Sequence, residues 1–251
     1  MRLCLPYHVP VLFRHCIVNG LFMFLSFFLV PQCHCADIHV PGDQPTIQDA
    51  INVAVNGDTV ILADGTYTGD GNKNINFNGK AITVTSANGP ENCTVFGGSY
   101  NVNGFIFESG EPNTSVLKSI TIDNFDKSSG GGIAISGDSS PRILNCVITD
   151  CERGVYCDNN GNPVSIEDTL FLENEGSESG IAVYLRAGSL NFSDCVFQDN
   201  YALNGTVYLY EGTMNLDGCT FINNGASHGS ALYLWGGMAT VTNCVFSNNS
   251  A

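Results

Sequence analysis

Three nearly identical hexamers recur in the C-terminal part of this 251-residue chain. They read CVFQDN at 195–200, CTFINN at 219–224 and CVFSNN at 244–249, and FLEN at 171–174 is a fainter fourth copy. The phenylalanines of this Phe-x-x-Asn element follow one another at intervals of 24 to 26 residues. A fixed period of about 20 to 50 residues is typical of solenoids, in which each repeat stacks on the next. This period constrains the fold more than any other feature of the sequence.

The repeats are made of short strands. Strands of the Val-Tyr-Leu type at 183–185 and 207–209 alternate aliphatic and aromatic side chains, and a second strand follows each of them after a turn. No stretch of the repeats has the apolar period of a helix, and helical solenoids need longer units of about 33 to 47 residues. The sequence therefore predicts an all-β fold, a single-stranded parallel β-helix of about eight to ten coils.

Equivalent residues of successive coils are expected to form columns, because neighbouring strands lie about 4.8 Å apart. The repeated phenylalanines would make an internal aromatic stack. The repeated asparagines would make a ladder at a turn, with each amide bonded to the coils above and below. The predicted stack contains Phe171, Phe197, Phe221 and Phe246, and the predicted ladder contains Asn174, Asn200, Asn224 and Asn249.

Cysteines also recur with the repeat. Cys195, Cys219 and Cys244 precede the phenylalanine in one column. We expect them to pack as small apolar side chains, and one disulfide within the column is the alternative. Cys151 and Cys157 are closer together in the sequence and are predicted to form a disulfide across a turn. No Cys-x-x-Cys pair or Cys/His group provides a zinc ligand set in the part of the chain after residue 36.

The charge of the chain bears on partners and cofactors. It has 24 acidic and 9 basic residues, a net charge of −15. Nucleic-acid binding requires clusters of Lys and Arg, and the sequence has none, so we expect no nucleic-acid partner. The densest acidic stretch contains Glu167, Asp168, Glu173, Glu175 and Glu178. Such a stretch either holds Ca²⁺ or forms a solvated face; we favour the solvated face and predict no cofactor.

Residues 1–36 differ from the rest of the chain. Arg2 and Arg14 precede an apolar run at 17–30, and the small residue Ala36 ends the segment. This order is typical of a secretory signal peptide, and the run is shorter than the roughly 20 residues of a membrane-spanning helix. An uncleaved signal anchor is the alternative. No later segment predicts a transmembrane helix, so we expect residues 37–251 to form one secreted or cell-surface domain.

Residues 37–96 form the N-terminal cap and first coils of this domain. Thr46 is predicted to cap a short helix with Asp49 three residues further on, and Ile47, Ala50 and Ile51 share its apolar face. The stretch PTIQDAINVAVNGDTVILADGTYTG at 45–69 resembles the first segment of right-handed parallel β-helix proteins of the pectin lyase-like superfamily. This resemblance covers residues 38–96. It implies a right-handed β-helix whose open end is covered by the helix.

The later repeats, at 130–251, resemble those of the chlamydial polymorphic outer membrane proteins, which combine a GGAI-like tetrapeptide with FxxN. The tetrapeptide corresponds to GGIA at 131–134, SGIA at 179–182 and GSAL at 229–232. The resemblance implies an adhesin-like scaffold at the outer membrane or cell surface, with a surface protein or a polysaccharide as its partner.

Aromatic side chains on one face of the repeats are the candidate contacts for such a partner, since aromatic rings suit sugar rings and protein surfaces. The alternative is that these rings stack on one another and stabilise the sheet. The predicted binding residues are Tyr184, Tyr208, Tyr210, Tyr233 and Trp235.

The superfamily also implies an enzymatic alternative, because it includes polysaccharide lyases, galacturonases, pectin esterases and epimerases. Their catalytic sets are not matched here. Ser227-His228-Gly229 corresponds only in part to the GHG motif of galacturonases, and Gly104-Phe105-Ile106-Phe107 lacks the aspartate of the esterase segment. We therefore predict a non-catalytic scaffold without naming a catalytic residue, and keep a carbohydrate-active enzyme as the alternative.

The sequence printed here stops at Ala251, directly after a complete repeat. A solenoid end without a covering helix or polar coil leaves backbone groups and apolar columns uncovered. We therefore expect either that the natural chain is longer or that this end associates with a partner or with a second copy.

Overall fold

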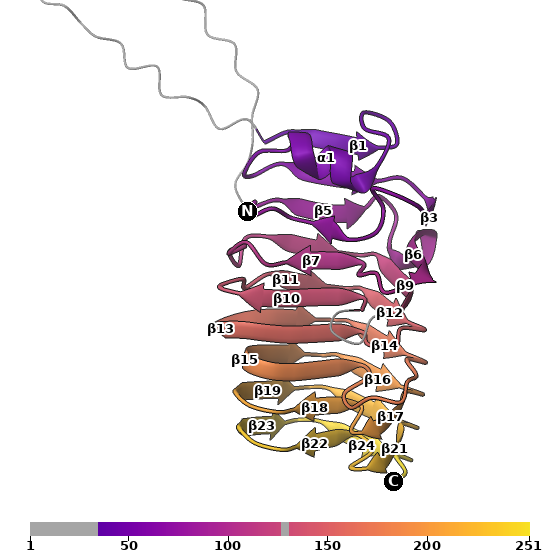
Figure 1. The fold of residues 1–251 in the computed structure, drawn as a ribbon, viewed down its shortest axis with the longest axis vertical. Helices are drawn as coiled ribbons and strands as arrows, with labels where there is room; N and C mark the ends of the chain where they lie inside the picture. Colours follow the sequence, from indigo (N-terminus) through magenta and orange to yellow (C-terminus); the bar gives the residue numbers. More distant parts are fainter. Residues whose placement is uncertain (1–34, 127–130) are drawn as a thin grey trace, which may run out of the picture.

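The chain forms a stack of coils in which each strand pairs in parallel with the equivalent strand of the next coil. The structure, a computed structural model, describes residues 35–126 and 131–251. It contains a parallel β-helix of about 8 turns, which Figure 1 shows with its coils stacked along the vertical axis. The predicted all-β fold is confirmed. The predicted signal peptide lies outside the described residues as far as residue 34.

Each coil contributes strands to three faces. The first face contains β4 (Ile75–Asn76), β7 (Phe105–Phe107), β10 (Ile133–Gly137), the first parts of β13 (Val155–Glu167) and β15 (Val183–Ser193), β18 (Val207–Leu209) and β22 (Leu232–Leu234). The second face contains β1 (Asp37–Val40), β2 (Thr59–Leu62), β5 (Thr83–Ser86), β8 (Val116–Lys118), β11 (Arg142–Leu144), the second parts of β13 and β15, β19 (Thr213–Asp217) and β23 (Met238–Thr242). The third face contains β3 (Gly65–Tyr67), β6 (Cys93–Tyr100), β9 (Thr121–Asp126), β12 (Val147–Thr149), β14 (Leu170–Leu172), β16 (Val196–Gln198), β20 (Thr220–Ile222) and β24 (Val245–Ser247).

The long strands β13 and β15 run around the corner between the first and second faces. These two faces therefore belong to one 14-stranded sheet, and the third face is a separate 8-stranded sheet. A further pair, β17 (Tyr201–Asn204) and β21 (Gly225–His228), lies outside both sheets, and a 3₁₀ turn, η1 (Pro90–Asn92), precedes β6.

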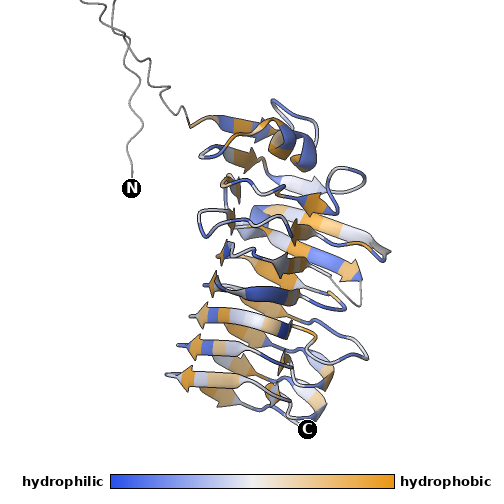
Figure 2. Ribbon diagram, turned by 60° about the vertical axis from the view of Figure 1, so that its left-hand side comes forward, coloured by the Kyte–Doolittle hydropathy of each residue, from blue (hydrophilic) through white to orange (hydrophobic). Residues whose placement is uncertain are grey.

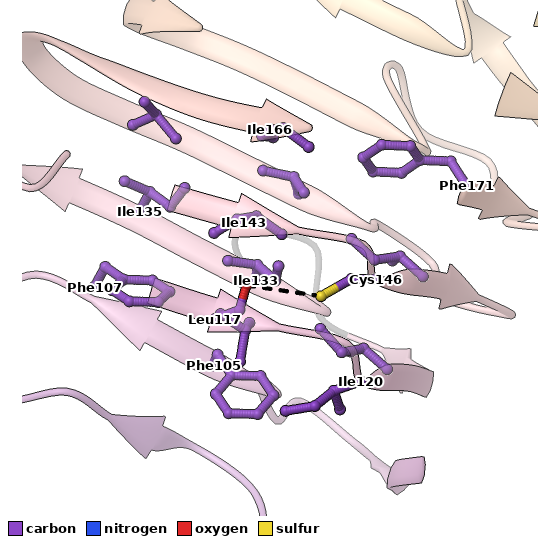
Figure 3. Packing of buried hydrophobic residues seen from close by; sticks show 14 of the residues in the cluster. Phe105, Phe107, Leu117, Ile120, Ile133, Ile135, Ile143, Cys146, Ile166 and Phe171 are labelled. Atoms are coloured by element: carbon purple, nitrogen blue, oxygen red, sulfur yellow. Dashed lines mark hydrogen bonds between the residues drawn. The ribbon is translucent and has the colours of Figure 1, made fainter. Parts of the chain in front are cut away.

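The core lies inside the coils because side chains alternate inward and outward along each strand. In β12 the inward Ile148 is fully buried, whereas Val147 and Thr149 on either side are half-buried. Inward side chains from all three faces meet in one cluster along the axis; Figure 3 shows this packing around Ile133 and Ile143. Figure 2 shows hydrophobic residues along the strands and mostly hydrophilic residues in the connecting loops.

Single residues in left-handed backbone bound the third face on both sides. At the turn into this face φ lies between 48° and 66° at Ser119, Asn145, Asp168, Asp194, Gly218 and Asn243. At the turn out of it φ lies between 51° and 59° at Asn124, Asp150, Glu173, Asp199, Asn223 and Asn248. Gly, Asn and Asp adopt this conformation at the lowest cost. The Asp, Gly or Asn that precedes each Cys-x-Phe strand, and the Asp or Asn that follows it, are therefore the residues that turn the chain.

The repeated phenylalanines form a column of parallel rings. The ring centroids are 4.7 Å apart for Phe171 and Phe197, 4.5 Å for Phe197 and Phe221, and 4.8 Å for Phe221 and Phe246. Interplanar angles of 7°, 6° and 4° show that the rings lie face to face. The column arises because β14, β16, β20 and β24 pair in register.

The repeated asparagines form a ladder next to this column. Asn174 donates from its backbone N and from Nδ2 to Oδ1 of Asn200, at 3.0 and 2.9 Å. The same two bonds join Asn200 to Asn224 and Asn224 to Asn249. Each Nδ2 also donates to a backbone carbonyl of the preceding coil, as in the 3.0 Å bond from Asn200 to Phe171. A buried amide thus satisfies backbone groups in the coils on both sides.

The helix α1 (Ile47–Val53) lies beside the first coil, at the upper end in Figure 1. Thr46 is its N-cap and accepts a bond from the backbone N of Asp49, as predicted from the sequence. The buried Ile47, Ala50 and Ile51 pack into the core cluster of the coils. At the other end the Nζ of Lys80 donates to the carbonyls of Ile51, Asn52 and Ala54, at 2.6 to 2.8 Å. The positive charge of a lysine at this position also interacts favourably with the negative end of the helix dipole.

Candidate functional site

A column of four tyrosines lies on the outside of the first face, along β13, β15, β18 and β22. The ring centroids are 5.7 Å apart for Tyr156 and Tyr184, 5.1 Å for Tyr184 and Tyr208, and 5.4 Å for Tyr208 and Tyr233. Interplanar angles of 6° to 7° mean that the rings are stacked. Their strands pair in register, so each Val-Tyr-Leu repeat puts its tyrosine in the same outward position.

Stacking within this column covers the faces of the rings. Tyr208, between two neighbours, is only 7% exposed. Burial raises the pKa of both Tyr184 and Tyr208, so these phenols stay neutral. A ligand would meet hydroxyls and ring edges here, and a sugar ring would find no open aromatic face on Tyr184 or Tyr208. The geometry of Tyr184 and Tyr208 thus agrees with the alternative that the rings stack on one another and stabilise the sheet. Tyr156 is an additional member of this column.

Arg153 packs against the first two rings of the tyrosine column. Its guanidinium carbon is 4.8 Å from the centroid of Tyr184 and 5.7 Å from that of Tyr156. The residue is 4% exposed, and burial lowers its pKa. A guanidinium over a tyrosine ring is stabilised by the negative face of the ring, more strongly when water is excluded. The sequence did not single out Arg153, because its contact depends on the turn that leads from β12 to β13.

Tyr210 and Trp235 lie in the next outward column of the same face. Tyr210 donates its backbone N to the carbonyl of Leu185, and Trp235 donates to Leu209 in the equivalent bond one coil later. Their side chains are 38% and 67% exposed. The preceding member of the column, Arg186, forms an ion pair with Asp158. Of the five aromatic residues predicted to bind a partner, these two are the most exposed, since Tyr184 and Tyr208 stack on both faces and the half-buried Tyr233 stacks on one.

An acidic hollow lies at the corner between the third and first faces. It has a volume of about 580 Å³ and is lined by Phe96, Gly98, Asn124, Asp126, Asp150, Glu152, Glu175 and Gly176. The lining residues come from β6, β9 and the segments that follow β12 and β14, so four successive coils contribute to it. The hollow cannot be recognised from the sequence, because these carboxylates share no short motif and meet only through the stacking of coils.

Two carboxyl groups of the hollow share a hydrogen bond. The bond to Asp126, with burial and repulsion by Asp126 as further causes, raises the pKa of Glu152 from 4.5 to about 7. The nearby guanidinium of Arg153 acts in the opposite direction. Burial and the charge of Asp150 likewise raise the pKa of Asp123. A carboxyl that keeps a proton near neutral pH can donate a hydrogen bond or a proton to a ligand.

The raised pKa of Glu152 predicts how the stability of the fold depends on pH. The folded chain holds the proton of Glu152 more tightly than the unfolded chain, so its contribution is fully present below pH 4.5 and lost as the pH rises through about 7. We expect the urea midpoint of the wild type to fall across this window, and that of Glu152→Gln to fall less. Glu211→Gln, an exposed carboxyl at another corner, is the control. Equal pH dependence in the wild type and Glu152→Gln would contradict the shared proton.

The cysteines of the repeats are buried thiols except Cys244, which is half-buried in the last coil and so packs only in part as predicted. Cys151 and Cys157, predicted as a disulfide, are free thiols in the structure, and their pairing stays a prediction. Burial raises the pKa of each to about 12. The backbone N of Cys151 donates to Oδ1 of Asn174, so this residue occupies the first position of the asparagine ladder. In the repeat column, Cys195 and Cys219 are buried, and Cys146 lies in the same column with its thiol toward the carbonyl of Leu117 (Figure 3).

The acidic stretch predicted as a solvated face or a Ca²⁺ site is spread along the coils. Glu167 forms an ion pair with Arg142 at 3.1 Å, and Asp168 and Glu173 are exposed at the two turns of the third face. Within residues 35–126 and 131–251, no three His, Cys, Asp or Glu side chains are grouped to hold a metal ion. In that same part of the chain, no helix has the length and apolar character that crossing a membrane requires.

The fold and the columns define a parallel β-helix in which each repeat makes one coil. The sequence model for the right handed beta helix region matches residues 49–251. The chain therefore belongs to the family of right-handed β-helix proteins. No curated protein and no solved structure gave a significant match.

Proposed function

We propose that this protein is a secreted or surface-exposed β-helix scaffold that binds a glycan or a surface protein in the manner of an adhesin. The observation that carries the proposal is the pair of accessible rings, Tyr210 and Trp235, in register on adjacent coils. Rigid aromatic side chains are the commonest anchors of binding surfaces. The stacked tyrosine column beside them holds the strands that carry them.

Sequence resemblances support the same proposal. The Phe-x-x-Asn and GGAI-like elements resemble the repeats of polymorphic outer membrane proteins, and the first coils resemble the pectin lyase-like superfamily. Residues 1–36 have the order of a secretory signal peptide, which would bring the domain to the cell surface or outside the cell.

Trp235 is the only tryptophan of the chain, so its fluorescence reports directly on this surface. We expect titration with one member of a panel of neutral and acidic polysaccharides to shift its emission. Tyr210→Ala should weaken this binding by about tenfold, the loss of one aromatic anchor. Tyr201→Ala removes a tyrosine of β17 that is more exposed than Tyr210, 54% against 38%, and should leave binding unchanged. Unchanged affinity in Tyr210→Ala would contradict the proposed site.

A carbohydrate-active enzyme is the second candidate, favoured by the carboxyl pair in the acidic hollow. Two carboxyl groups with different proton affinities are the usual acid and base of sugar chemistry. Incubation with pectin, alginate and polygalacturonate, with and without Ca²⁺, tests this candidate. New unsaturated or reducing ends that disappear in Glu152→Gln would replace the scaffold proposal by an enzymatic one.

A further inference from the structure

The third face carries apolar side chains on its outside as well as on its inside. In β14 the outward residues Leu170 and Leu172 flank the buried Phe171. Val147, Val196 and Ile222 occupy outward positions in β12, β16 and β20. The pairing register places these residues in two neighbouring columns, whose other members on the same four coils are Thr149, Gln198 and Thr220. We call Val147, Leu170, Leu172, Val196 and Ile222 the apolar strip; all five are half-buried.

The outward apolar residues are concentrated on the third face, and the second face of the same coils carries mostly polar residues in its outward positions. On the second face of the same coils, outward positions hold Ser165, Asn191 and Asn215. The side chain of Asn215 donates to that of Asn191 at 2.8 Å, in an exposed position. Strands that are apolar on both sides are typical of sheets covered on both sides. With five apolar residues in the eight outward positions of β12, β14, β16 and β20, the third face is closer to the composition of a covered face than the second face is.

Acidic residues border the strip on both edges. Asp168 and Asp194 are exposed at the turn into the third face, and Asp150 and Glu173 are exposed at the turn out of it. After Arg142 the sequence contains only two basic residues, Arg153 and Arg186. Arg153 is buried against the tyrosine column and Arg186 pairs with Asp158, both on the first face. Arg142, in the same coil as Val147, pairs with Glu167 at the end of the second face. Acidic residues therefore outnumber these three arginines along the edges of the strip.

The dimensions of the strip fit one α-helix. A strand of three residues spans about 10 Å, which is close to the 10 to 12 Å diameter of a helix with its side chains. Four coils stacked about 4.8 Å apart give the strip a length of about 15 Å, or roughly three turns of helix. A helix lying along the stack would place its apolar stripe on the strip. Residues on both flanks of that stripe would reach the acidic edges.

We propose that the apolar strip is a docking surface for a basic amphipathic α-helix of a partner protein. Aliphatic side chains of that helix would cover the strip, and Lys or Arg on its flanks would pair with the edge carboxylates. A second copy of this chain is a poor occupant, because it would bring the same acidic edges together and its net charge is also −15. This surface is separate from Tyr210 and Trp235, so the inference does not depend on the function proposed above.

A binding titration with designed peptides tests the proposal. The probe is a 14-residue helical peptide with leucine along one face and lysine on both flanks, and a matched peptide carries glutamate in place of lysine. Fluorescence anisotropy should show binding of the lysine peptide that weakens with salt, as expected for charge pairing. The glutamate peptide should bind at least about tenfold more weakly. Equal binding of the two peptides would overturn the proposal.

Matched variants separate the strip from the general acidity of the protein. Leu170→Ser with Leu172→Ser should weaken lysine-peptide binding by about tenfold or more, as loss of the central apolar contacts would. Asp168→Asn with Asp194→Asn should weaken it severalfold. The control, Asp138→Asn with Glu211→Gln, changes the same charge at the corner between the first and second faces and should have no effect.

Three further outcomes would overturn the assignment. The first is unchanged binding in the leucine pair, with circular dichroism showing that the variant is folded. The second is an equal loss in the edge pair and the control pair, which would mean non-specific attraction. The third is a wild-type dimer in sedimentation that the leucine pair dissociates, which would assign the strip to a second copy of the chain.

Discussion

Replacing Asn200 with alanine is expected to destabilise the protein by about 3 to 5 kcal/mol, because several buried hydrogen bonds are lost at once. The Oδ1 of Asn200 accepts bonds from the backbone N and the Nδ2 of Asn174. Its Nδ2 donates to the carbonyl of Phe171 and to Oδ1 of Asn224. Alanine would leave the buried backbone N of Asn174 without this partner, and would take one of two partners from the Nδ2 of Asn174 and from the Oδ1 of Asn224. An unsatisfied buried group costs about 1 to 3 kcal/mol.

Urea unfolding followed by circular dichroism measures this loss. Because each coil contacts only its neighbours, we also expect a broader transition in Asn200→Ala, in which the coils on the two sides unfold separately. Asn215→Ala is the control, since its amide makes an exposed bond to Asn191 and should cost less than about 1 kcal/mol. Similar midpoints for the two variants would show that the ladder amides do not stabilise the stack.

The coil architecture could be predicted from the sequence because its signal is local and repeated. The spacing of Phe197, Phe221 and Phe246 equals the number of residues in each of these coils. Parallel pairing in register then places equivalent residues in columns. The capping helix could be predicted equally well, since the hydroxyl of Thr46 accepts a bond from the backbone N of Asp49, only three residues further on. Both features depend on backbone geometry that neighbouring residues determine.

The candidate sites could be predicted only in part, because they depend on how side chains meet across coils. The Val-Tyr-Leu repeats indicated outward tyrosines, but alternation alone cannot say whether ring faces are open or stacked, as they are at Tyr208. Asp126 and Glu152 are 26 residues apart and become neighbours only through stacking. The buried Glu111 is a similar case: it accepts bonds from Gly79, Ser109 and Ser139 that no local pattern announces.

Two kinds of column therefore stabilise the stacking of the coils. The asparagine ladder satisfies polar groups at a turn, and the phenylalanine column fills the core beside it. The first sets the register of each coil, because a slip by one residue would break every amide bond in the ladder. The second contributes burial and contact between rings, which is less dependent on direction.

Replacing Phe197 with alanine tests the second contribution and is expected to cost about 3 to 5 kcal/mol. Phe197 is fully buried, lies face to face with Phe171 and Phe221, and has its ring centroid 5.8 Å from that of Phe192. The cavity left by alanine would remove contacts with three rings. Phe197→Leu keeps most of the volume and should cost less, about 1 to 1.5 kcal/mol.

Phe246→Ala is the matched control in the same column, because its side chain is 48% exposed and stacks on one ring only. We expect the decrease in urea midpoint, relative to the wild type, to be largest for Phe197→Ala, smaller for Phe197→Leu and smallest for Phe246→Ala. If Phe197→Ala stayed within about 1 kcal/mol of the wild type, the rings could not form a buried stack. The coils would then have to depend on the asparagine ladder and the backbone pairing for their cohesion.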